Sequence, residues 1–140
     1  VYGIYLEARK AKLEKNIVIG NLVRGIHVAH SRSVKISEND IINNKLGLYL
    51  QDSKRCFISK NNFINNQEHA EFDYIVAISV AGIYQTFTNL WLRNYWSNNS
   101  YPKIIFGEVM WCFFGTIAFT PWIQFDWMPS LKPIKWWENE

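Results

Sequence analysis

Side chains able to bind a sugar recur in this chain at one fixed interval, at Tyr5, His27, Tyr49 and Glu71. An aromatic ring packs against the apolar face of a sugar, and imidazole and carboxylate groups hydrogen-bond to its hydroxyls. If successive copies of the repeat stack, the four side chains form one strip on the outer surface, because they alternate with apolar neighbours. The same column has an alternative interpretation as an aromatic cross-strand stack that stabilises a sheet or contacts a neighbouring loop.

Three histidines, His27, His30 and His69, are candidate copper ligands. Copper prefers imidazole, thiolate and thioether groups. The other soft ligands of the chain are Cys56, Cys112, Met110 and Met128. His27 and His30 are separated by an odd number of positions on an expected strand, so their side chains point to opposite faces. We therefore expect the histidines not to converge and expect no cofactor, with bound copper left open as an alternative.

Catalysis on polysaccharides would need a further set of residues. A glycoside hydrolase needs two carboxylates about 5–10 Å apart across a cleft. Asp52, Glu71 and Asp73 are the acids that lie near one another in the expected stack. Arg24 or Arg55 would serve as the base of a lyase. These residues form no recognisable catalytic constellation, so the sequence favours a non-catalytic binding or scaffold module over a polysaccharide lyase or hydrolase.

Composition excludes some classes of protein. The chain has 140 residues, of which 49% are hydrophobic, and its formal net charge is +3. This composition is ordinary for a folded domain and excludes disorder. The modest charge predicts no nucleic-acid partner. Cys56 and Cys112 follow no metal-type spacing, so we expect two buried thiols, with a disulfide between them left open for an oxidising compartment.

A glycine repeat indicates how the chain positions these side chains. Gly3, Gly25 and Gly47 are equally spaced, and each begins a phrase of the type Gly-Ile-Tyr-Leu. The complete coils are residues 3–24, 25–46 and 47–68, and a degenerate fourth coil begins at 69. Two apolar columns are expected to face inward, and they comprise Ile4, Ile26, Leu48 and Ala70, then Leu6, Val28, Leu50 and Phe72.

Stacked coils of about 22 residues predict an all-β fold. Short apolar runs between Asn, Ser, Gly and Lys are typical of strands joined by turns rather than of helices. Each strand would lie about 4.8 Å above its equivalent in the preceding coil, which gives a right-handed parallel β-helix. We assign residues 1–88 to these coils. Val1 and Tyr2 occupy the last positions of a preceding coil, so we expect the chain to begin inside a longer solenoid.

Asparagine recurs at the nineteenth position of every complete coil, as Asn21, Asn43 and Asn65. Asparagine tolerates left-handed backbone, and its amide can bond to the asparagine one coil away. We expect these residues to form the corners and a ladder of hydrogen bonds. Coil one is less regular, because Glu14 falls where Ile36 lies in coil two, which indicates a local slip of register.

The last third of the chain differs in composition. All seven tryptophans lie within residues 89–140, which we assign to an aromatic-rich C-terminal cap over the open end of the stack. The uncharged run Val109–Phe125 leaves open a peripheral membrane contact through this aromatic tail. Gly115 and Pro121 make a membrane-spanning helix an unsuitable interpretation of that run.

The phrase Ile36-x-x-Asn39-x-Ile41-x-Asn43-Asn44, with the Gly-Leu-Tyr-Leu that follows it, resembles the right-handed parallel β-helix repeats of the NosD-like group. This group belongs to the pectate-lyase-like superfamily. The segments Asn89–Trp96 and Pro121–Trp127 are similar to the closing tails of exported archaeal members. The likeness covers about residues 3–72 and 89–133, and residues 73–88 match no part of the pattern.

The resemblance implies the C-terminal part of an exported protein that is extracellular, on the cell surface or periplasmic. Members of the group include copper-binding maturation factors, and relatives bind or cleave polysaccharides. Because one fold carries all of these activities, it does not choose among them. We expect a binding or scaffold module whose partner is a polysaccharide or another surface protein, with the copper-binding factor and the lyase or hydrolase relative as alternatives.

Overall fold

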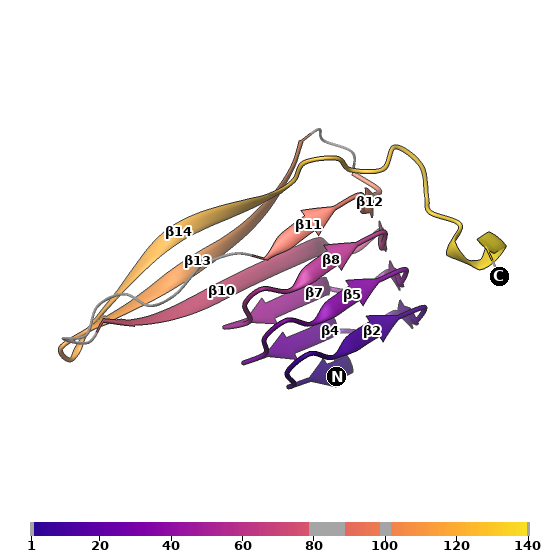
Figure 1. The fold of residues 1–140 in the computed structure, drawn as a ribbon. Helices are drawn as coiled ribbons and strands as arrows, with labels where there is room; N and C mark the ends of the chain where they lie inside the picture. Colours follow the sequence, from indigo (N-terminus) through magenta and orange to yellow (C-terminus); the bar gives the residue numbers. More distant parts are fainter. Residues whose placement is uncertain (1, 79–88, 99–101, 140) are drawn as a thin grey trace.

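The computed structural model describes residues 2–78, 89–98 and 102–139 (Figure 1). The first coil contains β1 (Tyr2–Leu6), β2 (Lys12–Glu14) and β3 (Ile17–Ile19). The second contains β4 (Arg24–Ala29), β5 (Lys35–Ser37) and β6 (Asp40–Ile42), and the third contains β7 (Leu46–Gln51), β8 (Phe57–Ser59) and β9 (Asn62–Ile64). The fourth contains β10 (Glu68–Ile78), β11 (Leu90–Leu92) and β12 (Tyr95–Trp96). After them come β13 (Lys103–Phe113), β14 (Thr116–Asp126) and a short 3-10 turn, η1 (Trp136–Asn139).

Equivalent strands of successive coils pair in parallel. One series runs β1, β4, β7, β10 and a second runs β2, β5, β8, β11, while β3, β6, β9 and β12 form a separate four-stranded sheet. The hairpin of β13 and β14 is antiparallel and joins the first two series into one ten-stranded sheet. The all-β prediction is confirmed. The large sheet is mixed, however, and not wholly parallel as the repeat alone predicted.

The two apolar columns face the inside of the coils as expected. Side chains alternate between the two faces of a strand, so every second residue of β4 and β7 points inward. Ile26, Val28, Leu48 and Leu50 are fully buried, and Phe72 continues the column in β10. Burying one such aliphatic side chain contributes about 1.5–3 kcal/mol to stability. The apolar core therefore follows the repeat from coil to coil.

The glycine column is required by a close approach between coils. A Cβ atom at Gly25 would lie 2.8 Å from the carbonyl oxygen of Gly47, and one at Gly47 would lie 2.5 Å from that of His69. The side chain of Asn44 fills the remaining space, with its Cγ 2.9 Å from the same position at Gly25. A larger residue would push the coils apart, which explains why glycine recurs at the same position of each coil.

The expected slip of register in coil one is present. Tyr2 of β1 pairs with Arg24, at the spacing of the glycine repeat, whereas Ile17 of β3 pairs with Asp40, one position beyond that spacing. In β2, Leu13 therefore takes the position opposite Ile36. Glu14 points the other way and accepts hydrogen bonds from the side chains of Lys35 and Ser37.

A ladder of asparagine hydrogen bonds runs along one corner of the stack. The Nδ2 of Asn21 donates to the Oδ1 of Asn44 at 2.9 Å, and the Nδ2 of Asn44 donates to the Oδ1 of Asn66 at 2.9 Å. The ladder was expected at Asn21, Asn43 and Asn65, and two of these positions were wrong by one residue. Asn43 and Asn65 are the left-handed corner residues, with φ of 54° and 51°, and each directly precedes a ladder residue.

A second, longer ladder begins at Asn16 and continues through Asn39, Asn61 and Asn94. Asp126 of β14 ends it, because its Oδ2 accepts hydrogen bonds from the backbone N–H and the Nδ2 of Asn94 at 2.9 and 3.0 Å. Asp126 is fully buried, and its Oδ2 also accepts the indole N–H of Trp96. A carboxylate fits the last position of the ladder because it only accepts hydrogen bonds.

The hairpin of β13 and β14 closes the C-terminal end of the stack. β13 pairs with β10 from Glu71 to Ile78, and the last residue of β14 pairs with Trp91 of β11. The edge that β10 would otherwise leave open is thereby paired from Glu71 onward, while β12 remains an edge strand of the four-stranded sheet. Figure 1 shows β10, β13 and β14 running on together as an arm beyond the shorter strands of the coils.

Two tryptophans of the tail fill the end of the core. The ring of Trp96 stacks on Phe63 with a centroid distance of 4.3 Å, and the indole N–H of Trp91 donates to Gln124 at 2.6 Å. Trp122 and Trp127, by contrast, are 42% and 58% exposed. The closure of the stack therefore rests on two buried indoles and on the hairpin backbone rather than on the whole set of seven rings.

The segment that matched no part of the repeat lengthens the fourth coil. β10 continues as far as Ile78, and residues 79–88 lie outside the described part of the chain. Beyond them Leu90 pairs with Phe57, whereas Phe57 pairs with Lys35 in the preceding coil, so the fourth coil is half as long again as the third. The division into residues 1–88 and 89–140 stays a prediction, and strands on both sides of it belong to the same sheets.

Two neighbouring asparagines allow a direct test of the ladder. We expect Asn44→Ala to lower the free energy of unfolding by about 2–4 kcal/mol, because it removes the acceptor of the backbone N–H of Asn21 and of one N–H of its side-chain amide. Asn43→Gly should change it by less than about 0.5 kcal/mol, because Asn43 is exposed and glycine accepts its left-handed backbone. Urea unfolding of both variants measures the difference, and equal losses would contradict the ladder as a source of stability.

Candidate binding surface

The sugar-binding candidates lie in one row on the outer face of the long sheet. Tyr5 pairs with His27, His27 with Tyr49, and Tyr49 with Glu71. The ring centroids of Tyr5 and His27 are 5.0 Å apart, and those of His27 and Tyr49 are 5.1 Å apart. Glu71 pairs in turn with Phe106 of β13, whose side chain is 67% exposed. The fold thus brings the four predicted residues together and extends their row by a fifth.

His27 is held in one state by its neighbours. A guanidinium only donates hydrogen bonds, so the contact of 3.3 Å between Arg24 and Nδ1 of His27 makes Nδ1 the acceptor. Nε2 then carries the proton and donates to Oε1 of Gln51 at 2.8 Å. Burial, and next the charge of Arg24, lower the pKa of His27. The imidazole is therefore neutral and has both nitrogen atoms engaged.

A groove opens beside the C-terminal half of this row, between β7, β10 and β13. Its volume is about 350 Å³, and it is lined by Tyr49, Glu71, Phe72, Asp73, Phe106, Gly107 and Glu108. The hydroxyl of Tyr49 donates to Asp73, and burial raises the pKa of this hydroxyl well above its ordinary value. The groove therefore combines acceptors for sugar hydroxyls with an exposed aromatic ring at Phe106.

Glu71 is the titratable residue of the groove near neutral pH. A hydrogen bond with Glu68, followed by burial, raises the pKa of Glu71 to about 7. Two carboxyl groups that share one proton cannot both ionise without repulsion. Near pH 7 the groove can consequently present Glu71 either as a hydrogen-bond donor or as an acceptor.

The histidines proposed as copper ligands do not come together. His30 lies at a corner with Nδ1 3.8 Å from Oδ2 of Asp52. His69 is buried against the rings of Phe63 and Trp96, and burial lowers its pKa to about 4. His27 has the partners described above. Each imidazole thus has its own surroundings. The predicted reason was alternation along one strand, but β4 ends at Ala29 and His30 lies at a left-handed corner with φ of 46°.

Part of this surface could not be identified from the repeat. Phe106 and Glu108 enter the groove from β13, which pairs with β10 at a separation in sequence that is larger than the period of the coils. Asp73 was noted as an acid, and its role as the acceptor for Tyr49 appears only in the structure. Its Oδ1 also accepts the backbone N–H of Asp52, which fixes the carboxylate in place. No pattern within the coils points to the β13 residues.

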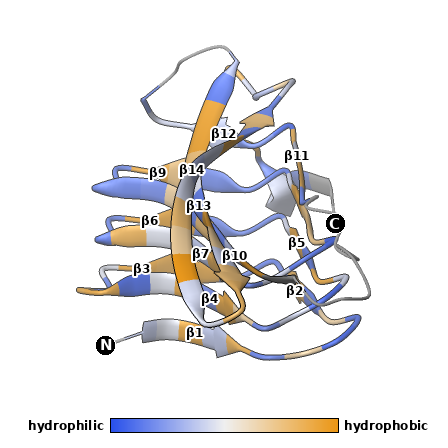
Figure 2. Ribbon diagram, turned by 90° about the vertical axis from the view of Figure 1, so that its left-hand side faces the viewer, coloured by the Kyte–Doolittle hydropathy of each residue, from blue (hydrophilic) through white to orange (hydrophobic). Residues whose placement is uncertain are grey.

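The arm presents a second, apolar surface. Every residue of β14 from Thr116 to Ile123 is exposed, and Phe114 at the turn is 87% exposed. Figure 2 shows hydrophobic residues along both strands of this hairpin. Neither strand carries a charged residue between Glu108 and Asp126. Peripheral membrane contact through this aromatic segment stays a prediction.

Comparison with known families agrees with the repeat. The family model described as periplasmic copper-binding protein (NosD) matches residues 1–101, which is more than half of the chain. The chain belongs to the NosD family. No curated protein and no solved structure matches it. The NosD family is described as periplasmic, in agreement with the expected extracellular, surface or periplasmic location. Within the described residues, no helix is long and apolar enough to cross a membrane.

The description of the NosD family names copper, so the positions of the possible donor side chains decide whether this chain could hold it. In residues 2–78, 89–98 and 102–139, no three His, Cys, Asp or Glu side chains lie together in a way that could hold a metal ion. Cys56 is buried, and burial raises the pKa of its thiol, which opposes formation of the thiolate that binds copper. The donors present in the described chain do not fit a copper centre.

The raised pKa of Glu71 predicts a pH dependence of stability. Because its pKa is about 7 in the folded protein against an ordinary 4.5, the folded state binds the proton more tightly. The resulting stability is complete below pH 4.5 and is lost as the pH rises through 7. We expect Glu71→Gln to raise the melting temperature at pH 8 by about 2 °C and to leave it unchanged at pH 4. Glu7→Gln is the control and should show no such difference between the two pH values. A melting temperature of Glu71→Gln that shifts equally at pH 4 and pH 8 would contradict a raised pKa at Glu71.

Proposed function

We propose that the chain is a right-handed parallel β-helix of the periplasm or cell surface that acts as a non-catalytic binding module for a polysaccharide. The coils supply a rigid surface, because β4, β7 and β10, which carry His27, Tyr49 and Glu71, are each fixed by parallel pairing on both sides. The mixed part of the sheet is confined to the hairpin that ends the stack. The ligand would lie across the coils along the row of Tyr5, His27, Tyr49, Glu71 and Phe106.

The observation that carries this proposal is the continuity of the row. With strands about 4.8 Å apart, the row extends for about 19 Å from Tyr5 to Phe106. Its two end rings, Tyr5 and Phe106, are the most accessible, at 54% and 67% exposed, and the groove that contains Glu71 and Asp73 lies at the Phe106 end. A sugar chain laid along the row meets an aromatic ring at either end and hydroxyl acceptors in the middle.

The contacts within the row also support its alternative interpretation as a cross-strand stack. Arg24 lies 4.2 Å over the ring of Tyr49, and His27 is only 5% exposed, so neither ring offers a free face. His27 and Tyr49 therefore pack within the row and hold its other members in place. Tyr5, Phe106 and Glu71 are the residues available to a ligand.

A non-catalytic role is supported by how the acids are engaged. Asp52 forms an ion pair with Lys54 at 2.9 Å and accepts the backbone N–H of Ile75. Asp73 accepts from Tyr49 and from the backbone of Asp52. Carboxylates committed to such structural bonds are poor candidates for proton transfer to a substrate.

Affinity electrophoresis through gels containing soluble polysaccharides tests the proposal. We expect Tyr5→Ala to weaken retention by about 2- to 10-fold, the value of one lost ring contact, without lowering the melting temperature by much. The control is Ile17→Ala, which removes an apolar side chain of similar exposure from β3 in the other sheet. Retention that is equal in wild type and Tyr5→Ala on every retarding polysaccharide would refute the row as the binding surface.

The NosD family is described as copper-binding, and the histidines expected as candidate ligands allow a direct test of that property in this chain. Equilibrium dialysis against Cu²⁺ compares the wild type with the double variant His27→Ala, His30→Ala. We expect the same copper uptake in both proteins, because both imidazoles have other partners and lie apart. Loss of one equivalent of copper from a double variant that remains folded would show that these histidines are ligands after all.

A further inference from the structure

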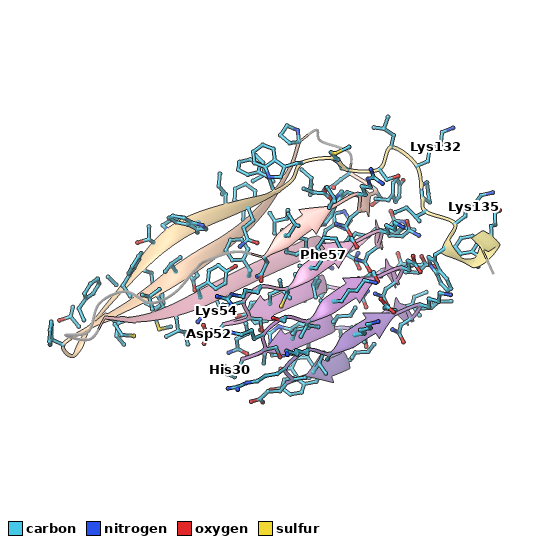
Figure 3. The ribbon with its side chains drawn as sticks, in the orientation of Figure 1. His30, Asp52, Lys54, Phe57, Lys132 and Lys135 are labelled. Atoms are coloured by element: carbon cyan, nitrogen blue, oxygen red, sulfur yellow. The ribbon has the colours of Figure 1, made fainter. Side chains whose placement is uncertain are left out.

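The C-terminal tail is fixed against the corner of the stack that precedes β6 and β9. The backbone N–H of Ile134 donates to Asn62 at 2.7 Å, and Nδ2 of Asn62 donates to the carbonyl oxygen of Ile134 at 2.8 Å. The indole N–H of Trp136 donates to Oδ1 of Asp40 at 3.1 Å. Three hydrogen bonds therefore hold Ile134 and Trp136 in place, and we call this segment the wall. Figure 3 shows it near Lys135, beside the ends of the strands.

A groove lies between this wall and the coils. Its first part has a volume of about 310 Å³ and is lined by Glu38, Lys60, Arg93, Met128, Ser130, Ile134 and Trp136. A second part of about 200 Å³ shares Glu38, Lys60 and Arg93 with the first and continues over β5, β8 and β11, where Phe57, Ser37 and Ser59 line it. The two parts form one continuous groove on a different face from the Tyr5 row.

The repeat places the charges at the centre of this groove. Glu38, Lys60 and Arg93 occupy the same left-handed corner of successive coils, with φ of 58°, 55° and 58°. Residues at such a corner point outward, so the three side chains form a column about 4.8 Å apart per coil. Lys60 lies 4.0 Å from Glu38, and within the described residues no carboxylate forms an ion pair with Arg93. The centre of the groove thus has two cations and one carboxylate.

This combination favours one class of ligand. Arg93 and Lys60 would hold an anionic group, and the indole of Trp136 offers an aromatic wall. A free inorganic anion would use only the two cations and gain nothing from Glu38, whereas a sugar also supplies a hydroxyl that Glu38 can accept. An acyl chain would meet charged and serine side chains. We propose that the groove binds an anionic sugar, with its carboxylate or sulfate at Arg93 and Lys60, a hydroxyl at Glu38 and its ring on Trp136.

The test is isothermal titration calorimetry of the whole chain with four probes, namely an oligogalacturonate, a sulfated heparin oligosaccharide, a neutral cello-oligosaccharide and inorganic sulfate. We expect at least one anionic oligosaccharide to bind and sulfate alone to bind more weakly, while any binding of the neutral probe belongs to the Tyr5 row and is unchanged by substitutions in the groove. The two anionic probes distinguish a carboxylate from a sulfate as the recognised group. The site does not depend on the function proposed above, so Tyr5→Ala should bind the anionic probe as the wild type does.

Variants locate the site. The double variant Arg93→Gln, Lys60→Gln should weaken binding at least about 10-fold, because each charged hydrogen bond contributes strongly to affinity. The control Lys45→Gln, Lys132→Gln removes the same charge from exposed positions outside the groove and should bind as the wild type does. Trp136→Phe keeps an aromatic wall and should retain more affinity than Trp136→Ala.

Three results would overturn the proposal. The first is absence of binding of both anionic oligosaccharides to the wild type. The second is an equal loss of affinity in the groove variant and in the control variant, which would indicate attraction by net charge alone. The third is a loss of affinity for the neutral probe in the groove variant as large as the loss for the anionic probe, which would show that the groove does not select for an anionic group. Thermal unfolding of each variant verifies that it is folded, which is expected because Lys60 and Arg93 are exposed.

Discussion

The structure depends on the hydrogen bond from the side-chain amide of one asparagine to the amide oxygen of the next along the stack. Asn44 can take its place in this ladder only because Gly25 beside it has no Cβ atom. The glycine and asparagine columns are therefore one constraint, which sets the length of each regular coil. Because the corners are fixed, the strands between them are too short to change register. The corners therefore set the spacing of the outward side chains on every face of the coils.

Because equivalent positions of successive coils lie above one another, two faces of one stack can differ in chemistry. On the long sheet, residues at one position of each coil form the row that starts at Tyr5 and ends beside the acidic groove of Glu71 and Glu108. At a corner facing the tail, another position gathers Lys60 and Arg93. Substitutions at an outward position leave the core untouched, so each column can acquire its own charge and ring content. The ladder thus permits binding surfaces without defining them.

The sequence predicted the parts of the structure that repeat. The inward columns, the slip at Glu14 and the row beginning at Tyr5 all follow from period and alternation. The ladder was predicted correctly at Asn21 and one residue too early at Asn43 and Asn65, because two asparagines adjoin there and composition does not tell which of them turns the corner. The hairpin could not be predicted, because β13 pairs with β10 through contacts distant in sequence. The groove at Arg93 was missed for the same reason, since its wall comes from Trp136.

The ladder that starts at Asn16 has a direction. Each amide donates toward the following coil and accepts from the preceding one, and the series stops at Asp126, which has no N–H to pass on. Whole coils can be inserted or deleted upstream of this aspartate without changing how the stack terminates. The length of the stack can therefore change by about 4.8 Å with each coil, while its C-terminal end stays the same.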